Sequence, residues 1–513
     1  MMSNASSLPK SWVQVTIADL GKIVSGGTPS TKENSYWGGS VSWISPSDLT
    51  GYTSKHISKG AKSITQAGLK NSSAIVMPAG SIHFSSRAPI GYTVISSCDM
   101  TTNQGFKSLV PIQGIFNEYI YYFFKSAKQL AESVATGTTF KEISGAAFSK
   151  LPVPIPPTKE QRRIVAKIEE LFSDLDKGVE NLKTARVQLK LYRQALLKHA
   201  FEGKLTAQWR AENQDKLETA EVLLKRIGRE RAQRHQEQLA DWEAAGKQGS
   251  KPKAPKSLPP LTADERAEFP ELPHGWVYTR VGAVIDDPAY GTSKKCDYEI
   301  DGAGVLRIPN VISGKIDAAD LKFAHFTDDE LAAYKLEAGD ILIIRSNGSV
   351  SIVGRCAIVR DAELDYLYAG YLIRLRPNLR LVAPEYLLNA FSLHSVRKQI
   401  EQKAKSTSGV NNINTGEIQS LVVALCSIEE QKLIRTEIES RLSEVDQLDQ
   451  TITTALQQAE AMRQSILKKA FSGRLVPRDP RDEPASALLA RIKAERAAQS
   501  ATSKSLKAAR ETS

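Results

Sequence analysis

The feature that most constrains this chain is a long segment that occurs twice. Residues 158–203 align without a gap on residues 428–473 at a single offset of 270. The pairs brought together include Glu160 with Glu430, and both copies end in a shared run that places a Phe two residues before a Gly. Internal repetition on this scale predicts a duplicated architecture.

Both copies are predicted to be long helices with one apolar stripe. Apolar positions recur at steps of three and four between charged residues, as in a coiled-coil seam. Prolines before residue 158 and the glycines Gly203 and Gly473 bound the helices. Some 45 residues at ~1.5 Å each make a rod of about 67 Å. The expected seam positions are Ile164, Ile168, Leu171, Leu175, Gly178, Leu182, Ala185, Leu189, Tyr192 and Leu196 in the first copy, and Ile434, Ile438, Val445, Leu448, Ile452, Ala455, Ala459, Met462 and Ile466, interrupted by Arg441, in the second.

A helix this long with an apolar stripe needs a partner. We expect the two copies to pair with each other, and repetition about a two-fold axis would make them antiparallel. Pairing with a helix of another protein is the alternative.

A globular region precedes each long helix. In residues 11–155, short β-branched and aromatic runs alternate with Gly, Pro and Ser clusters, which predicts short strands with substantial loops. Residues 271–425 repeat these blocks loosely in the same order. A charged helix is expected from about 220 to 242, with a repeat near 485–492, and residues 246–262 are interpreted as an exposed Pro- and Lys-rich linker.

The predicted fold class is α+β, with two globular domains separated by a pair of long antiparallel coiled-coil helices in a pseudo-two-fold internal repeat. The expected segments are a first globular domain at 1–157, the first long helix at 158–203, a charged helix and linker at 204–270, a second globular domain at 271–427, the second long helix at 428–473, and a charged helix with a disordered tail at 474–513.

Composition narrows the setting in which such a chain would act. The formal net charge of +11 favours a polyanionic partner. Cys98, Cys296, Cys356 and Cys426 lie far apart, so reduced thiols and a cytoplasmic protein are expected. No apolar run is long enough for a transmembrane helix, and the first ten residues are polar, unlike a signal peptide. We therefore expect no membrane partner.

Motifs for catalysis are weak. Asp286-Asp-Pro-Ala-Tyr290 is similar to the acidic Pro-Pro-Tyr motif of amino-methyltransferases, but Ala289 replaces the second proline and no Gly-rich cofactor loop accompanies it. We interpret it as a structural turn. The seven histidines are scattered, and His83 alternates like a buried strand residue. We expect no catalytic site, metal or cofactor, although spacing alone leaves open a site assembled in space.

Two stretches combine apolar strands with polar loops that could read DNA. Arg can bond a guanine edge, and Asn or Gln an adenine edge. The region 1–155 has 13 basic and 7 acidic residues, a net charge of +6, whereas 271–425 has 17 and 19, a net charge of −2. The second region therefore needs a local basic face to bind phosphate. The candidates are Arg87, Asn103, Gln104 and Lys107 in the first region and Arg307, Arg345, Asn347 and Arg355 in the second. An ordinary turn at 345–348 is the alternative.

With these features in place, the chain resembles the specificity subunits of Type I restriction-modification enzymes. The resemblance covers about residues 11–476. It rests on duplicated order more than on any one motif. The sequences that carry it are Gly27-Thr-Pro-Ser, Tyr36-Trp-Gly-Gly and Trp43-Ile-Ser; Arg345-Ser-Asn-Gly-Ser, Val353-Gly-Arg and Tyr371-Leu-Ile-Arg-Leu-Arg-Pro377; and Pro154–Gln161, Arg193–Leu205 and Arg463–Leu475. Two departures are a second long helix without a Pro-rich entry and a long linker between the repeats.

The resemblance implies a non-catalytic protein with two target-recognition domains, each reading half of a bipartite asymmetric site in double-stranded DNA. The paired helices would act as a ruler and as the dock for two methyltransferase subunits, and endonuclease/translocase subunits would complete the complex. The alternatives are a specificity subunit of a related methyltransferase–nuclease system, a coiled-coil adaptor that binds no DNA, and an enzyme with an unrecognised site.

Overall fold

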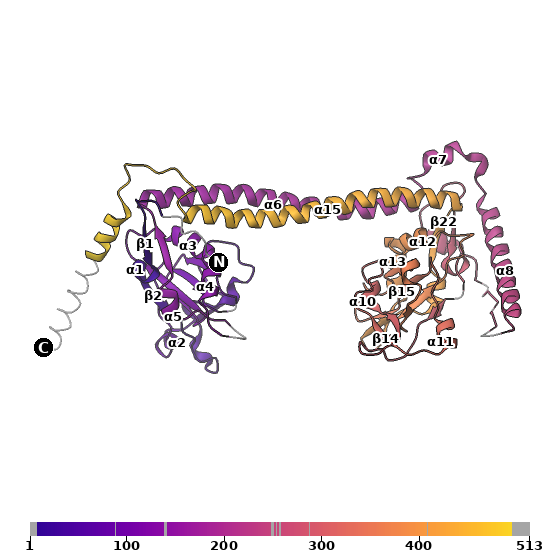
Figure 1. Ribbon diagram of the computed structural model, residues 1–513, viewed down its shortest axis with the longest axis horizontal. Helices are drawn as coiled ribbons and strands as arrows, with labels where there is room; N and C mark the ends of the chain where they lie inside the picture. Colours follow the sequence, from indigo (N-terminus) through magenta and orange to yellow (C-terminus); the bar gives the residue numbers. More distant parts are fainter. Residues whose placement is uncertain are drawn as a thin grey trace. The chain divides into compact units, whose positions relative to one another are not determined.

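The computed structural model describes residues 8–494 except 88, 138–140, 248–250, 253, 256–257, 287 and 408. The chain forms two compact units (Figure 1). Unit 1 is Met1–Lys183 with Thr453–Ser513, and unit 2 is Thr184–Ile452. Each long helix therefore contributes residues to both units. The predicted α+β class, with two globular regions and two long helices, is confirmed.

The described part of unit 1 contains three sheets. Its five-stranded sheet has the order β2-β9-β6-β7-β4, its three-stranded sheet the order β5-β3-β8, and β1 pairs with β10. The strands are β1 Val13–Thr16, β2 Gly21–Ser25, β3 Trp37–Ile44, β4 His56–Ile57, β5 Lys62–Ile64, β6 Ile82–Ser85, β7 Thr93–Ser96, β8 Thr101–Thr102, β9 Phe106–Pro111 and β10 Pro152–Ile155. The helices outside the long pair are α1 Ile17–Leu20, η1 Asn34–Tyr36, η2 Pro46–Leu49, α2 Gln66–Lys70, α3 Asn117–Ser126, α4 Lys128–Ser133 and α5 Gly145–Ser149. A further helix runs over residues 485–494.

Unit 2 repeats much of this plan. A four-stranded sheet has the order β12-β19-β15-β17, two three-stranded sheets the orders β14-β13-β18 and β16-β21-β20, and β11 pairs with β22. The strands are β11 Val277–Arg280, β12 Ala289–Tyr290, β13 Ala303–Leu306, β14 Lys322–Ala324, β15 Ile341–Ile344, β16 Ser346–Asn347, β17 Cys356–Ile358, β18 Leu367–Tyr368, β19 Leu372–Leu375, β20 Lys405–Thr407, β21 Val410–Asn412 and β22 Val422–Leu425. The helices are α7 Ala207–Glu212, η3 Gln214–Lys216, α8 Ala220–Ala244, α9 Ala263–Ala267, η4 Val281–Ala283, α10 Ile308–Val311, α11 Asp328–Ala333, η5 Asp361–Glu363, α12 Pro384–Phe391, α13 His394–Lys403 and α14 Thr415–Gln419.

The two three-stranded sheets β5-β3-β8 and β14-β13-β18 have the same pattern of strand directions. In each, the central strand has one antiparallel and one parallel neighbour. In unit 1, Trp43 on the central strand β3 pairs with Lys62 of β5 on one side and with Thr101 of β8 on the other. Val305 pairs in the same way with Lys322 and Leu367. Lys62 and Lys322 therefore occupy equivalent positions, although the sequences around them have diverged.

The long helices α6, Thr158–Phe201, and α15, Ile428–Phe471, have the predicted bounds. Both end at a glycine with φ of +71°, Gly203 and Gly473, which only glycine adopts without strain. In both, the residue after the glycine donates its N–H to a carbonyl five residues earlier, which caps the last turn. The repeated Phe and Gly are thus a repeated helix end.

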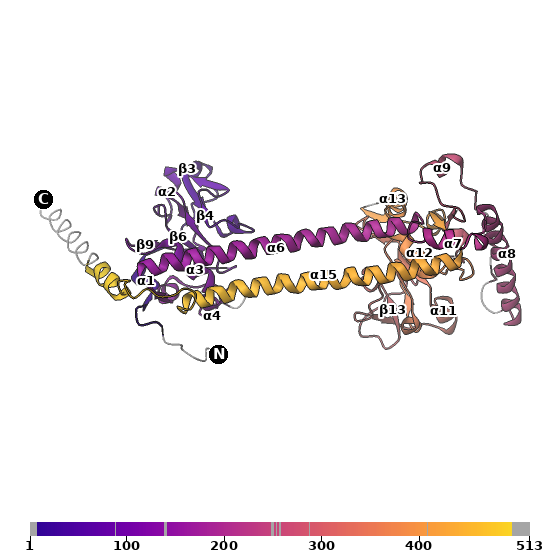
Figure 2. The same ribbon diagram turned by 90° about the horizontal axis from the view of Figure 1, so that it is seen from above.

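Repeat-related ion pairs join the two helices within each unit, where the ribbons run side by side (Figure 2). In unit 1, Arg463 of α15 bonds Asp176 of α6. In unit 2, Arg193 of α6 bonds Asp446 of α15 at the positions related by the offset of 270. A residue later in one helix meets one earlier in the other, so the predicted antiparallel pairing is confirmed.

The predicted seam is wrong at two positions in each copy. Tyr192, Leu448 and Met462 are 45%, 52% and 53% exposed, and Gly178 is exposed as well. The seam instead passes through the next residue: Val179, Arg193, Asp449 and Arg463 are half-buried. The charged residues among them bury their aliphatic parts at the interface while their charged groups pair at its edge.

A short helix follows each long helix and packs on the unit that the long helix enters. Leu223 and Ile227 of α8 are buried in the core of unit 2, and the helix over 485–494 buries Leu488 and Ile492 in the core of unit 1. The predicted helix near 220–242 is confirmed as α8. In unit 1, Ala127 separates the consecutive helices α3 and α4.

Candidate nucleic-acid interface

The structure brings the four candidates of unit 1 to one place. Asn103 and Gln104 directly follow β8, and Lys107 is the second residue of β9. Asn103 Oδ1 accepts the N–H of Gly105 at 2.9 Å. A Cβ on Gly105 would lie 3.0 Å from Asn103 Oδ1 and 3.1 Å from Arg87 Nε, so both side chains pack directly against this glycine.

Their exposure differs, and this separates their roles. Gln104 is exposed, and its Oε1 accepts a hydrogen bond from the hydroxyl of Thr28, which belongs to the Gly-Thr-Pro-Ser segment. Lys107 is only 7% exposed, and its ammonium lies 3.5 Å from a carboxylate oxygen of Glu142. Arg87 is half-buried and has no ion-pair partner in the part of the chain that the structure describes. Arg87, Asn103 and Gln104 thus present polar groups, whereas Lys107 supports the loop from within.

In unit 2, Arg345 is held by several groups but is not neutralised. Its guanidinium carbon lies 4.7 Å from the centroid of the Tyr290 ring. Its Nε donates to Asn412 Oδ1 at 3.2 Å, and an Nη donates to the carbonyl of Gly370 at 3.4 Å. No carboxylate among the described residues pairs with it. A fixed, half-buried cation with free N–H groups suits bidentate bonding to a base edge or a phosphate.

The other candidates of unit 2 lie in different settings. Asn347 Oδ1 accepts the N–H of Ser349 at 2.9 Å and so closes its own turn. Arg355 is exposed and donates to the carbonyl of Ser351. Arg307 follows β13 and lies 3.3 Å from Asp320. No contact joins Arg307 to Arg345 among the described residues, so the structure groups Arg345, Asn347 and Arg355 near one loop and leaves Arg307 on a neighbouring sheet.

The two arginines at the strand ends are not equivalent. The backbone carbonyl of Ser86 accepts the N–H of Ile143. The backbone carbonyl of Arg345 accepts the N–H of Ile413, and Ile413 lies 270 positions after Ile143. Arg345 therefore corresponds to Ser86, and Arg87 corresponds to Ser346. Successive strand residues face opposite ways. The two units thus offer arginines on different faces of the same strand end.

Two contributors to the site are absent from the candidates chosen on sequence. Tyr290 ends the Asp286–Tyr290 motif and lies on β12, where its ring supports Arg345. Asn412 is separated from Arg345 by 67 positions and reaches it through the pairing of β16 with β21. Of these two residues, only Tyr290 has a signal in the sequence, as the aromatic end of the motif interpreted above as a structural turn. Asp286 itself accepts hydrogen bonds from Arg234 and Gln238 of α8.

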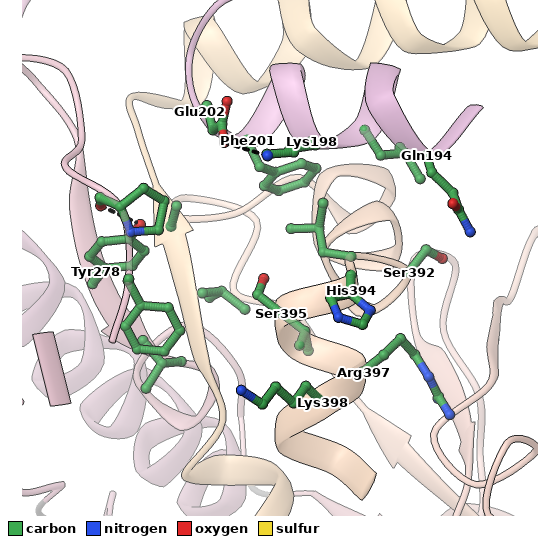
Figure 3. A pocket seen from close by; sticks show the side chains of 18 of the residues that line it. Gln194, Lys198, Phe201, Glu202, Tyr278, Ser392, His394, Ser395, Arg397 and Lys398 are labelled. Carbon is green, nitrogen blue, oxygen red and sulfur yellow. Dashed lines mark hydrogen bonds and ion pairs between the residues drawn. The ribbon is translucent and has the colours of Figure 1, made fainter. Parts of the chain in front are cut away.

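A cavity of about 620 Å³ lies elsewhere in unit 2 (Figure 3). It is lined by the end of α6, the start of α13, β22 and residues 268–270 of the segment between the repeats. His394 shares this lining with Ser392 and Ser395 but makes no hydrogen bond to either among the described residues.

The histidine predicted to be buried, the cysteines and the possible metal ligands form no reactive cluster among the described residues. His83 is fully buried, bonds Ser108 Oγ at 2.9 Å, and has its pKa lowered to about 3 by burial. The four cysteines are free. Within the described ranges, no group of three or more His, Cys, Asp or Glu side chains could hold a metal ion. No described helix is both long and apolar enough to cross a membrane.

Comparison with known proteins gives this geometry a context. Residues 9–184 match the family described as the Type I restriction modification DNA specificity domain. The chain is 37% identical over 195 residues to the MjaIX specificity subunit of Methanocaldococcus jannaschii, which covers 37% of this chain and 45% of that protein. It is 29% identical over 401 residues to the EcoKI specificity subunit of Escherichia coli K12, which covers 76% and 74%.

A solved structure from work on complex assembly and conformational transition of the type I R-M system has the same fold. The TM-score is 0.64 at 19% identity, with 91% of this chain and all of that chain covered. The matches to specificity subunits, the domain in residues 9–184 and the shared fold agree with one another. Residues 9–184 carry the Type I restriction modification DNA specificity domain, and the chain is similar over most of its length to a specificity subunit of a Type I restriction enzyme.

Proposed function

We propose that units 1 and 2 each read one half of a bipartite, asymmetric sequence in double-stranded DNA. One observation carries the proposal. In both units, the loop after the parallel strand of the three-stranded sheet meets the strand-end residue at 86 or 345, and polar side chains gather there. Because these side chains differ between the units, the two half-sites would differ in sequence.

The chain is a non-catalytic subunit, so the chemistry must come from partners. We propose that two methyltransferase subunits dock on it and that endonuclease/translocase subunits complete the complex, acting on DNA in the cytoplasm. The family and the two folded units argue against an adaptor that binds no DNA. A related methyltransferase–nuclease system remains the alternative, and it would differ in the partners recovered with the chain.

The proposal is tested by sequencing methylated DNA from its host with and without the gene for this chain. We expect methylated adenines in one two-part asymmetric motif, and we expect them to disappear with the gene. A matched strain with Arg360→Ala, an exposed arginine on a turn outside the polar cluster, should keep the same motif. Retention of every methylated motif without the gene would contradict the proposal.

A further inference from the structure

The loops that follow β8 in unit 1 and β18 in unit 2, here called the readout loops, carry different side chains. Both units nevertheless share a lysine that contacts an aromatic ring. Lys62 on β5 lies with its ammonium 5.5 Å from the centroid of the Trp37 ring. Lys322 on β14 lies 4.6 Å from the centroid of the Tyr298 ring. The strands and registers are equivalent, since each lysine pairs with the middle strand at the same point. The aromatic partner differs, but the lysine and its cation–π contact are present in both.

Both lysines keep their charge available. Lys62 is exposed and Lys322 half-exposed. In the part of the chain that the structure describes, neither ammonium has a carboxylate partner. A ring face restrains an ammonium without neutralising it and leaves its three N–H donors for another acceptor. Arg307 also approaches the Tyr298 ring, at 5.9 Å, but it pairs with Asp320, so Lys322 carries the uncompensated charge at this ring.

The position of each lysine relates it to the readout loop. Lys62, Trp43 and Thr101 form one row across the sheet, and Asn103 follows two residues later. Lys322, Val305 and Leu367 form the matching row, and the chain then reaches Gly370, which bonds Arg345. Two strand spacings place each lysine about 10 Å across the sheet from the strand that enters the loop.

We infer that Lys62 and Lys322 are equivalent contacts to DNA phosphates, one beside each readout loop. The inference rests on the proposed function. The major groove is about 12 Å wide, so a loop that reads base edges has phosphates at the distance where these lysines lie. A phosphate contact carries no sequence information. This explains why the lysine persists while the reading side chains have diverged. It also supplies unit 2 with a local basic site despite the net charge of −2 over 271–425.

The test uses the complex recovered from its host through a tag on this chain, with Lys62→Gln, Lys322→Gln and the double variant. Binding is measured from low to high salt on two duplexes of about 30 base pairs, one carrying the methylated motif and one of random sequence. Each phosphate contact contributes about 0.9 to the slope of log affinity against log salt. We expect each substitution to reduce the slope by about 1 and to weaken binding roughly fivefold at 0.15 M salt on both duplexes.

The matched control is Lys225→Gln, which removes the same charge from α8, where Lys225 pairs with Glu221, and should leave the slope unchanged. Lys62→Arg and Lys322→Arg should restore the slope, which shows that a loss with Gln is not misfolding. An unchanged slope in the Gln variants would overturn the inference, and so would a loss confined to the motif duplex. If the wild-type complex preferred no duplex, the proposed function would fail instead.

Discussion

At the scale of single residues, Arg345 is held in place without losing its charge. The Tyr290 ring, Asn412 and the Gly370 carbonyl fix the guanidinium, and no described acid pairs with it. Asn347, two residues on, uses its side-chain oxygen Oδ1 to accept the N–H of Ser349 and close a turn. The two candidates therefore differ: Arg345 is free to bind, whereas Asn347 shapes the loop that presents it.

This difference predicts a difference between two substitutions. Arg345→Ala should weaken binding to the target duplex by about 1–3 kcal/mol and relax preference at one position, because a bidentate base contact is lost. Arg360→Ala, the exposed control, should change neither. Binding to duplexes that vary one base at a time measures both effects. Equal binding by Arg345→Ala and wild type across all the duplexes would remove Arg345 from the readout.

Glu160 and Glu430 lie at matched positions in the first turns of the two long helices but have different surroundings. Glu430 is fully buried and accepts hydrogen bonds from Thr206, Arg210 and Trp276. Glu160 is also buried, but its Oε1 has no hydrogen-bond partner among the described residues. Burial raises the pKa of Glu160, against smaller opposing effects of nearby groups such as Trp12.

The folded-state pKa of Glu160 therefore lies above its unfolded value. Such a carboxyl favours the folded state at low pH, and this contribution is lost as pH rises through the folded-state pKa. Glu160→Gln should therefore raise the unfolding temperature relative to wild type at pH 7, with a smaller difference at pH 4. Glu430→Gln should lower stability at pH 7, by about 1–3 kcal/mol, because it removes a charged acceptor from buried donors. The same sign of change at pH 7 in both variants would contradict this account.

At the scale of elements, the long helices were the most predictable part of the chain. Prolines before the first helix and a glycine after each helix act locally on the backbone, and the gapless repeat carries the start of the first helix over to the second. The seam was less predictable. Tyr192 and Met462 look like interface residues, but Arg193 and Arg463 lie there instead, since paired charges can occupy positions that an apolar pattern does not reveal.

The candidate readout site was also only partly predictable from the sequence. Loop positions after β8 could be identified from the sequence, because polar residues follow an apolar strand. The contact of Arg345 with Asn412 could not, since it depends on the pairing of two strands far apart in the chain. The one-residue difference between Arg87 and Arg345 likewise appears only once the hydrogen bonds fix the register.

The ion pair between Arg463 and Asp176 can be tested by exchanging the two charges. Arg463→Asp should destabilise the chain by up to about 1 kcal/mol for the lost pair, with a further loss from two facing acids. Adding Asp176→Arg should recover much of this, although the contact of Arg463 with the Phe172 ring, at 5.0 Å, is not restored. Thermal unfolding of the single and double variants gives the coupling between them. Strictly additive effects would show that the two residues are not paired.

At the scale of the whole molecule, the chain is two units joined by two shared helices. Each unit combines a globular region with the start of one long helix, the end of the other, and the short helix that follows it. The proposed domain boundaries at 157 and 427 remain predictions. They imply that each globular region can be exchanged without disturbing the other.

The shared helices predict control over the spacer between the half-sites. One helical turn added near Lys183 and one near Thr453 should lengthen the preferred spacer and keep both half-sequences, because the paired insertion preserves the seam on both sides. The motif methylated in the host gives the spacer directly. An insertion in one helix alone should impair folding, since it shifts the register. A folded paired variant that retained the original spacer would refute a ruler role.

The most direct test of the central claim is an exchange of residues 11–155 for the corresponding region of a relative with a different sequence, followed by sequencing of methylated DNA in the host. If each unit reads its own half-site, one half of the motif should change to a new sequence while the other half and the spacer stay as they were. A change in both halves, or in neither, would contradict independent reading by the two units.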